Sequence, residues 1–358
     1  MIKQARLKKG LKMSVNPYSL TFGKEPKQAI SRAAQMIDIL ENFREDMPSQ
    51  QIYMISGVRG CGKTVFMTEV AKNLKEQENF IIVELNSSGD LLSDFAAALA
   101  SEDYLARIFQ QASINLSFFG IGLEVKGSVP ITNVQVAISK MLESIKKHKK
   151  KVMVCIDEVT ATEQMKIFAS AFQIFIRQDL PLYLLMTGLY ENINSLQNEK
   201  NLTFLYRAPK IELKPLNIRT IALNYKKTFK INEDVATKMA KLTKGYSFAF
   251  QVLGYFTWSH NGDYELALDE YRQYLEDYVY EKIWYELSGK DKQFLYGVAS
   301  SRNGKTSEIK EILGIANNEY TPYRDRLIKR GILNGNEHGT LTFSLPLFED
   351  YVRSNYIE

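Results

Sequence analysis

The sequence is poor in several residue types, and each shortage excludes a class of protein. Its 358 residues include only Cys61 and Cys155, too few for a disulfide framework, so we expect a reducing, cytoplasmic setting. The three histidines are His148 in a lysine run and His260 and His338 in polar stretches. This scarcity argues against a histidine-rich metal site and against a serine–histidine triad.

Long apolar runs and a distributed charge excess are also lacking. No apolar run reaches the roughly 18 residues of a membrane helix, and the basic N-terminus lacks the apolar stretch and cleavage site of a signal peptide. The 46 Lys+Arg exceed the 41 Asp+Glu by five, and residues 1–12 account for the whole excess. The remaining chain is neutral, so net charge gives little support for nucleic-acid binding.

Short apolar runs alternate with segments of helical periodicity over the first 213 residues. Runs typical of buried strands occur at residues 51–56, 80–85, 152–156, 182–186 and 211–213, and the first helix is expected from residue 27 to 44. This alternation predicts a parallel sheet with helices on both faces. After Pro215 the pattern is helical to residue 285, and three short helices with two short strands are expected beyond it.

Two segments of this first part allow two interpretations each. Residues 113–126 alternate apolar and polar around Gly120 and Gly122, which indicates an inserted β-hairpin or, alternatively, a loop. The lysine run at residues 146–151 is more typical of a solvated helix end than of a binding patch.

Residues 57–64, GVRGCGKT, match the pattern G-x-x-x-x-G-K-[ST] between a predicted strand and a predicted helix. The glycines let the backbone curl so that successive N–H groups point at phosphate oxygens, next to the positive end of the helix. Lys63 is expected to reach the β- and γ-phosphates, and the Thr64 hydroxyl to coordinate Mg²⁺. The residues expected to contact the nucleotide are Gly57, Val58, Arg59, Gly60, Cys61, Gly62, Lys63, Thr64 and Val65.

Polar side chains also follow two of the other predicted strands. Asp157 and Glu158 follow the strand at 152–156, and ligands gather at the carboxyl ends of parallel strands. Asp157 can hold Mg²⁺ there, and Glu158 can orient and deprotonate an attacking water. Thr187 follows the next strand and is expected to bond that water or the γ-phosphate; an ordinary strand-ending turn is the alternative.

In this order the motifs resemble those of P-loop ATPases of the AAA+ and STAND type. GVRGCGKT resembles Walker A, VMVCIDE resembles Walker B with its adjacent catalytic glutamate, and Thr187 lies where sensor 1 would be. More closely, the chain is similar to prokaryotic ATPases related to archaeal origin-recognition proteins. The segments that carry this similarity are NPYSLTFGKEP followed by Arg32, FLYRAPKIELKPL, TKGYSFAFQVLG, LIKRGIL and FSLPLFEDYVR.

The resemblance implies a four-part organisation and a nucleotide cofactor. A basic arm (1–27), an α/β P-loop core with a five-stranded parallel sheet (28–213), a helical lid (214–285) and a winged helix (286–358) are expected. ATP or ADP with Mg²⁺ is implied, with the adenine between core and lid near residues 26–32. The lid stretch YSFAFQ after Gly245 lacks the sensor-2 arginine of origin-type proteins. Arg177 and Arg207 are candidate arginine fingers acting in trans within a homo-oligomer, or else solvated arginines.

The expected winged helix offers one short basic helix face to a partner. Arg324, Arg326, Lys329 and Arg330 are its candidate duplex-DNA contacts, yet residues 286–358 carry ten basic and ten acidic side chains. Three hypotheses follow: an Mg²⁺-dependent ATPase that moves its lid and winged helix, a nucleotide-gated DNA-binding module with little turnover, and a switch that docks a protein. The acidic stretch 263–281 motivates the third hypothesis.

Overall fold

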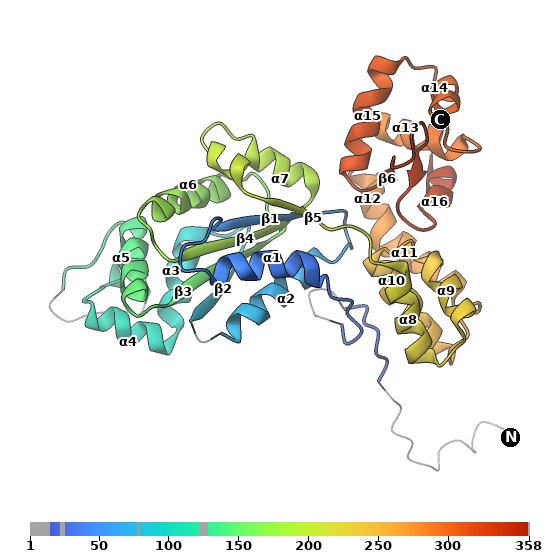
Figure 1. The fold of residues 1–358 in the computed structure, drawn as a ribbon. Helices are drawn as coiled ribbons and strands as arrows, with labels where there is room; N and C mark the ends of the chain where they lie inside the picture. The colour runs from blue at the N-terminus through green and yellow to red at the C-terminus, as the bar shows by residue number, and fades with distance from the viewer. Residues whose placement is uncertain (1–14, 22–25, 78, 122–127, 357–358) are drawn as a thin grey trace, which may run out of the picture.

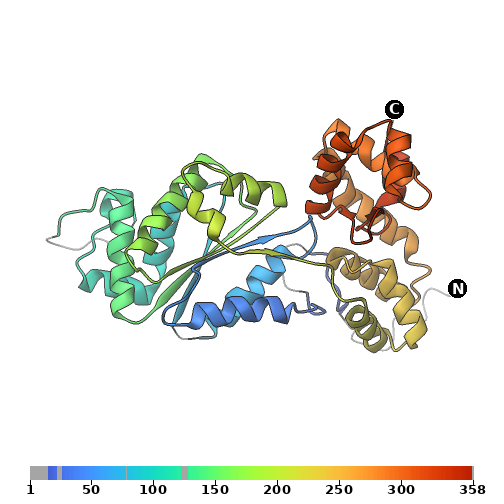
Figure 2. The same ribbon diagram turned by 45° about the horizontal axis from the view of Figure 1, so that its top comes forward.

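The computed structural model describes residues 15–21, 26–77, 79–121 and 128–356. A layered α/β core lies at one side, and the helices that follow it lie at the other (Figures 1 and 2). The core sheet is parallel throughout, with the strand order β2-β3-β4-β1-β5. Its strands are β1 (Ile52–Ser56), β2 (Phe80–Asn86), β3 (Lys151–Asp157), β4 (Leu182–Gly188) and β5 (Lys210–Glu212). The predicted five-stranded sheet is confirmed.

The central strands β1, β3 and β4 are mostly apolar because helices bury both faces of the sheet. In β3, Met153 and Cys155 face the helices α1 and α2, whereas Val152, Val154 and Ile156 face α3 to α7. One face is covered by α1 (Ala33–Arg44) and α2 (Lys63–Lys75). The other is covered by α3 (Leu91–Ser101), α4 (Asp103–Gln111), α5 (Val134–Lys147), α6 (Glu163–Arg177) and α7 (Tyr190–Gln197), with the short helix η2 (Thr203–Arg207) after α7.

A helical lid follows β5 and packs around aromatic side chains. Its elements are α8 (Ile218–Phe229), α9 (Glu233–Leu242), α10 (Ser247–Ser259), α11 (Leu268–Leu275), the π-helical turn η3 (Glu276–Tyr280) and α12 (Glu281–Tyr285). Tyr18 from the N-terminal arm inserts among Tyr225, Phe229 and Phe250, and its ring lies against Gly254 of α10. A Cβ at residue 254 would lie 2.5 Å from that ring, so the missing side chain admits the arm.

The C-terminal region has the element order of a winged helix. It contains α13 (Gly289–Ser300), α14 (Thr306–Leu313), α15 (Asn317–Lys329), the antiparallel strands β6 (Leu333–Asn334) and β7 (Thr342–Phe343), and α16 (Phe348–Asn355). Helix α13 begins with a capping box in which Ser288 and Asp291 bond each other's backbone N–H groups. This order agrees with the winged helix expected at the C-terminal end of the chain, while the bounds 286–358 stay a prediction.

Two local predictions were wrong in the described residues. The first helix begins at Ala33 rather than at residue 27, because residues 26–29 form a turn in which Ala29 N–H bonds the Pro26 carbonyl. No strand forms in the described part of residues 113–126, so the hairpin interpretation was wrong there and the loop alternative agrees with the structure; η1 (Ser117–Phe119) is a 3₁₀ turn held by the Asn115 side chain. Residues 122–126 of that prediction lie outside the described residues.

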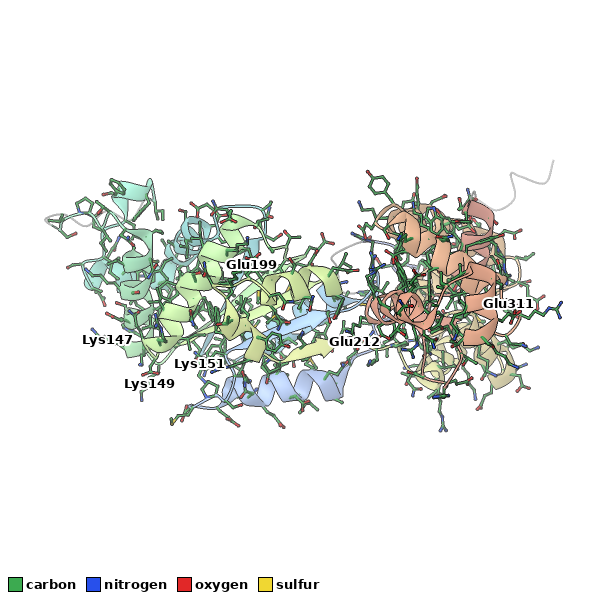
Figure 3. The ribbon with its side chains drawn as sticks, turned by 90° about the horizontal axis from the view of Figure 1, so that it is seen from above. Lys147, Lys149, Lys151, Glu199, Glu212 and Glu311 are labelled. Carbon is green, nitrogen blue, oxygen red and sulfur yellow. The ribbon has the colours of Figure 1, made fainter. Side chains whose placement is uncertain are left out.

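The lysine run is neither wholly solvated nor near the other candidate residues. Figure 3 shows Lys147 and Lys149 at the end of the core away from the C-terminal helices, whereas Glu311 lies at the opposite end of the molecule. Lys151 instead donates to the carbonyl oxygens of Phe43 (3.0 Å), Arg44 (3.2 Å) and Glu45 (2.6 Å). It therefore caps the C-terminus of α1, and burial lowers the pKa of its ammonium group.

Candidate active site

The glycine-rich loop curls between β1 and α2, as its sequence predicts. Gly60 (φ +74°) and Gly62 (φ +94°) adopt left-handed backbone conformations that side chains disfavour. The Lys63 ammonium donates to the carbonyl oxygens of Gly57 (3.0 Å) and Val58 (3.1 Å), which holds it over the loop. Cys61 is buried, and its Sγ would lie 2.6 Å from a Cβ on Gly57. Cys61 therefore fills the inside of the loop.

Two hydroxyl groups and one carboxylate, each from a separate element, meet at the carboxyl edge of the sheet. Thr64, in the first turn of α2, donates to Asp157 Oδ2 over 2.6 Å. Thr187, fully buried near the end of β4, donates to Asp157 Oδ1. Both carboxylate oxygens of Asp157 are thus oriented by hydroxyl groups. A hydroxyl and a carboxylate are ligands suited to Mg²⁺, which usually completes its shell with waters and substrate phosphates.

Glu158 has a strained backbone and a specific ionic partner. Its φ of +51° lies in the left-handed region that non-glycine residues seldom adopt. Its N–H bonds Asp157 Oδ1 (2.9 Å), and its carboxylate lies 3.7 Å from the Arg59 guanidinium. Cys155 lies two residues before Asp157 in β3. Burial raises the pKa of its thiol to about 12, so it stays protonated and is a poor nucleophile.

One cavity of about 670 Å³, a volume typical of small-molecule sites, is lined by Lys63, Thr64, Asp157 and Glu158, whereas Thr187 is not part of its lining. Its polar part contains the loop residues, Asp157 and Glu158. Its apolar part comes from the arm, the start of the core and the lid: Leu20, Pro26, Ala29, Ile30, Leu216 and Phe250. The described residues hold no cluster of three or more His, Cys, Asp or Glu side chains that could bind a metal by itself. A divalent ion here would therefore depend on ligands from a bound molecule.

A comparison with family models matches the part of the chain that holds this site. Residues 31–206 match the family described as "ATPase domain predominantly from Archaea". Over these residues the chain is similar to that ATPase family. Residues 277–352 match a "Domain of unknown function (DUF8462)", and a comparison with curated proteins finds no match.

Solved structures extend the likeness to nearly the whole chain. The Walker-type ATPase PABY2304 of Pyrococcus abyssi is 15% identical, with 94% of this chain and 99% of that chain covered and a TM-score of 0.66. The ORC2 protein of Aeropyrum pernix, determined as ADPNP–ADP complexes, is 12% identical over 93% and 95% of the chains (TM-score 0.62). Cdc6p of Pyrobaculum aerophilum is 14% identical over the same shares (TM-score 0.50). The chain thus has the fold of a P-loop AAA+ protein related to archaeal origin-recognition proteins.

The lid donates hydrogen bonds to backbone carbonyl groups of the Walker A loop. Tyr246 Oη donates to Arg59 O (2.7 Å), Phe248 N–H to Gly60 O (3.2 Å) and Ser247 Oγ to Cys61 O (2.9 Å). Arg32, which precedes α1, also donates to Cys61 O (3.0 Å) and to the Lys214 carbonyl. Burial lowers the pKa of the Arg32 guanidinium, so these acceptors offset its desolvation.

The winged helix also contacts the ATPase domain beside the same cavity. Arg59 donates to Glu286 (2.9 Å) at the start of the C-terminal region, and Arg330 pairs with Glu191 of α7. All four of these residues line the cavity. No local sequence pattern predicts these pairs, because the two partners in each are far apart in the chain.

Except for Arg330, the predicted arginine fingers and DNA-contact residues do not line the cavity. Arg177 and Arg207 are exposed at the ends of α6 and η2, where neither lines the cavity. Among the four cations assigned to DNA, Arg324 pairs with Asp325, Arg326 with Asp291 and Arg330 with Glu191. Lys329 is exposed, with its ammonium 6.0 Å from the Tyr190 ring centroid. DNA contact by this face therefore stays a prediction.

Sequence reasoning missed several residues that shape the site. Tyr246, Ser247 and Phe248 belong to a segment recognised for its resemblance, and Arg32 follows another, but their contacts with the loop could not be read from spacing. Glu191 and Glu286 carried no signal at all. In the described chain no helix is both long and apolar enough to cross a membrane.

Proposed function

We propose that the chain binds ATP with Mg²⁺ in this cavity and hydrolyses it to ADP and phosphate. The observation that carries the proposal is the convergence of Lys63, Thr64 and Asp157 beside Glu158 in one cavity, with Asp157 hydrogen-bonded by the buried Thr187. The apolar part, between arm and lid, suits an adenine ring, and the loop with its helix N-terminus suits the phosphates.

Each polar residue has a chemical role in the proposal. Lys63 binds the β- and γ-phosphates as a point charge, and Thr64 and Asp157 hold the metal. Mg²⁺, when bound, neutralises the charge that develops on the phosphate oxygens. Glu158 accepts the proton of the attacking water, and Thr187 keeps Asp157 in place through its hydrogen bond.

The proposal extends to movement of the parts outside the core. We divide the chain into an arm (1–27), core (28–213), lid (214–285) and winged helix (286–358). Lid and winged-helix residues line the same cavity as the Walker residues, so a bound nucleotide contacts all three. Nucleotide state thereby biases the positions of lid and winged helix.

Two substitutions test hydrolysis and binding separately. Glu158→Gln should lower ATP turnover by about 10²–10⁴-fold while leaving ATP affinity within a few fold. Lys63→Ala should abolish detectable binding, whereas Lys290→Ala, at an exposed cation of the winged helix, should change neither. Equal turnover of Glu158→Gln and wild type would refute the proposed catalytic role.

A nucleotide-gated switch with little turnover is a second candidate function. The ion pair between Glu158 and Arg59 favours it, because a paired carboxylate is less available to a water molecule. Its partner is duplex DNA or a protein at the winged helix, with the N-terminal arm contributing to DNA binding. Fluorescence anisotropy of labelled duplex at two salt concentrations tests DNA binding. Binding that does not weaken with salt would exclude phosphate contacts by Arg324, Arg326, Lys329 and Arg330.

Turnover by a homo-oligomer is the remaining part of the proposal. Arg177 and Arg207 are exposed and outside their own cavity, so as arginine fingers they act on a neighbouring copy. Specific ATPase activity should then rise with protein concentration, and Arg207→Ala or Arg177→Ala should flatten that rise. Activity independent of concentration would remove both as fingers.

A further inference from the structure

Arg330 belongs to the winged helix in sequence but to the nucleotide cavity in space. It follows the last turn of α15, where Gly331 turns the chain with φ +75°. Its side chain is 13% exposed and lines the cavity together with the Walker A residues. The guanidinium pairs with the Glu191 carboxylate, and its Nη1 lies 4.0 Å from Asp291 Oδ2. A cation predicted to face DNA thus faces the ATPase domain.

The position of Arg330 is fixed from two sides. Its neighbour Gly331 packs on the Walker A loop, where an added Cβ would lie 3.3 Å from Val58 Cβ. Its partner Glu191 lies in the first turn of α7, three residues beyond Gly188, the last residue of β4. The same strand supplies Thr187, which bonds Asp157. Arg330 is therefore held between the phosphate-binding loop and the strand edge that carries the hydrolytic residues.

The ion pair between Arg330 and Glu191 is of a kind that a phosphate group could replace. The two charges are close, but Glu191 Oε1 makes no aligned hydrogen bond within the described residues. A guanidinium presents a planar fork of donors that matches a phosphate group as well as a carboxylate. A terminal phosphate in the cavity would compete with Glu191 for this fork, and its charge would repel that carboxylate.

We propose that Arg330 recognises the terminal phosphate of ATP by exchanging Glu191 for it, so that the winged helix contributes the preference for ATP over ADP. This inference rests on the proposed nucleotide binding. The lid stretch YSFAFQ carries no arginine, so in this proposal the cation that distinguishes ATP from ADP comes from the winged helix. Glu191 is the competitor that limits the preference.

Nucleotide affinities, measured by calorimetry with a non-hydrolysable ATP analogue and with ADP, test the exchange. Arg330→Ala should weaken binding of the analogue about tenfold and binding of ADP less than twofold, because the charge-assisted bond is made to the terminal phosphate. Arg330→Lys should fall between wild type and Arg330→Ala, since it keeps the charge without the fork. Glu191→Gln should shift the ratio the other way, by a few fold in favour of the analogue.

The substitutions at Arg330 and Glu191 should change the ratio of analogue to ADP affinity in opposite directions, which separates phosphate recognition from damage to the fold. A folding defect cannot explain the tighter analogue binding expected for Glu191→Gln, and Lys290→Ala, an exposed charge removed from the same domain, should leave the ratio unchanged. Wild-type protein that binds neither nucleotide would refute the proposed function. Wild-type protein that binds both, with an unchanged ratio in Arg330→Ala, would overturn the role of Arg330 alone.

Discussion

Arg59 links Glu158 of the ATPase domain to Glu286, where the lid ends and the winged helix begins. Its Nη2 donates to Glu286 Oε1 over 2.9 Å, and its Nη1 lies 3.7 Å from Glu158 Oε1. Arg59 Nε is buried and has no hydrogen-bond partner among the described residues. One guanidinium is therefore shared between the proposed catalytic base and the C-terminal region.

Removing the Glu286 charge should make the ATPase slower. In Glu286→Gln, Arg59 is left to Glu158 alone, and the stronger pairing should lower kcat by about two- to fivefold, the range of a partly exposed ion pair. Arg59→Gln should raise kcat, because it frees Glu158. Steady-state ATPase assays measure both, and a rise in kcat in Glu286→Gln would contradict the shared-guanidinium interpretation.

The buried hydroxyl of Thr187 should matter for stability and for metal dependence. Thr187→Val removes the donor to Asp157 and leaves that carboxylate less well oriented, at a cost of about 1–3 kcal/mol in the free energy of unfolding. The Mg²⁺ concentration required for half-maximal nucleotide binding should also rise.

Thr257→Val is the matched control, because Thr257 is equally buried but its hydroxyl has no partner among the described residues. It should be neutral or stabilising in chemical denaturation. Equal losses in the two variants would show that burial of a hydroxyl, rather than the bond to Asp157, decides the effect.

Gly60 should be intolerant of any side chain. In Gly60→Ala the added Cβ would meet Tyr246 Oη at 2.2 Å and would force a side chain into φ +74°. ATP binding should be lost. Adding Tyr246→Phe removes the nearest atom but not the backbone strain, so it should restore binding only in part.

Gly289→Ala provides the comparison for Gly60→Ala, because nothing lies within 4 Å of its added Cβ. Its melting temperature and its ATP affinity should match those of wild type. Full ATP affinity in Gly60→Ala itself would show that the lid does not constrain the loop.

Alkaline conditions should destabilise the core through Cys155. Burial raises the pKa of its thiol from 9.0 to about 12, so the folded state holds a proton that the unfolded state releases. The resulting stability is complete below pH 9 and is lost as pH rises toward 12, at up to about 1.4 kcal/mol per pH unit. Denaturation at several pH values should give a shallower decline for Cys155→Ala, and identical slopes would contradict the assignment.

Residues whose role follows from local chemistry could be predicted from the sequence. The Walker A glycines, Lys63 and Thr64 follow one another in the chain, and the apolar runs of β1, β3 and β4 place Asp157 and Thr187 at one sheet edge. Parallel pairing alone then brings these side chains together. No knowledge of the lid or of the winged helix is needed.

Contacts between separate parts of the chain could not be predicted in this way. The basic face of α15 has the composition of a DNA-contacting helix, yet three of its cations are paired with acids, one of them across the domain boundary. The start of α1 was misplaced for a similar reason, since the helical periodicity continues through a turn at residues 26–29. Periodicity records which residues are apolar, not which distant surface meets them.

The carbonyl contacts between lid and Walker A loop fix the direction of the amide groups that follow. In a trans peptide the C=O of one residue and the N–H of the next point in opposite directions. Because Arg59 O and Cys61 O bond Tyr246 and Ser247, the N–H groups of Gly60 and Gly62 point away from those lid residues. The lid thus aligns amide dipoles on the far side of the loop, and lid residues with no phosphate contact of their own set how strongly the loop attracts an anion.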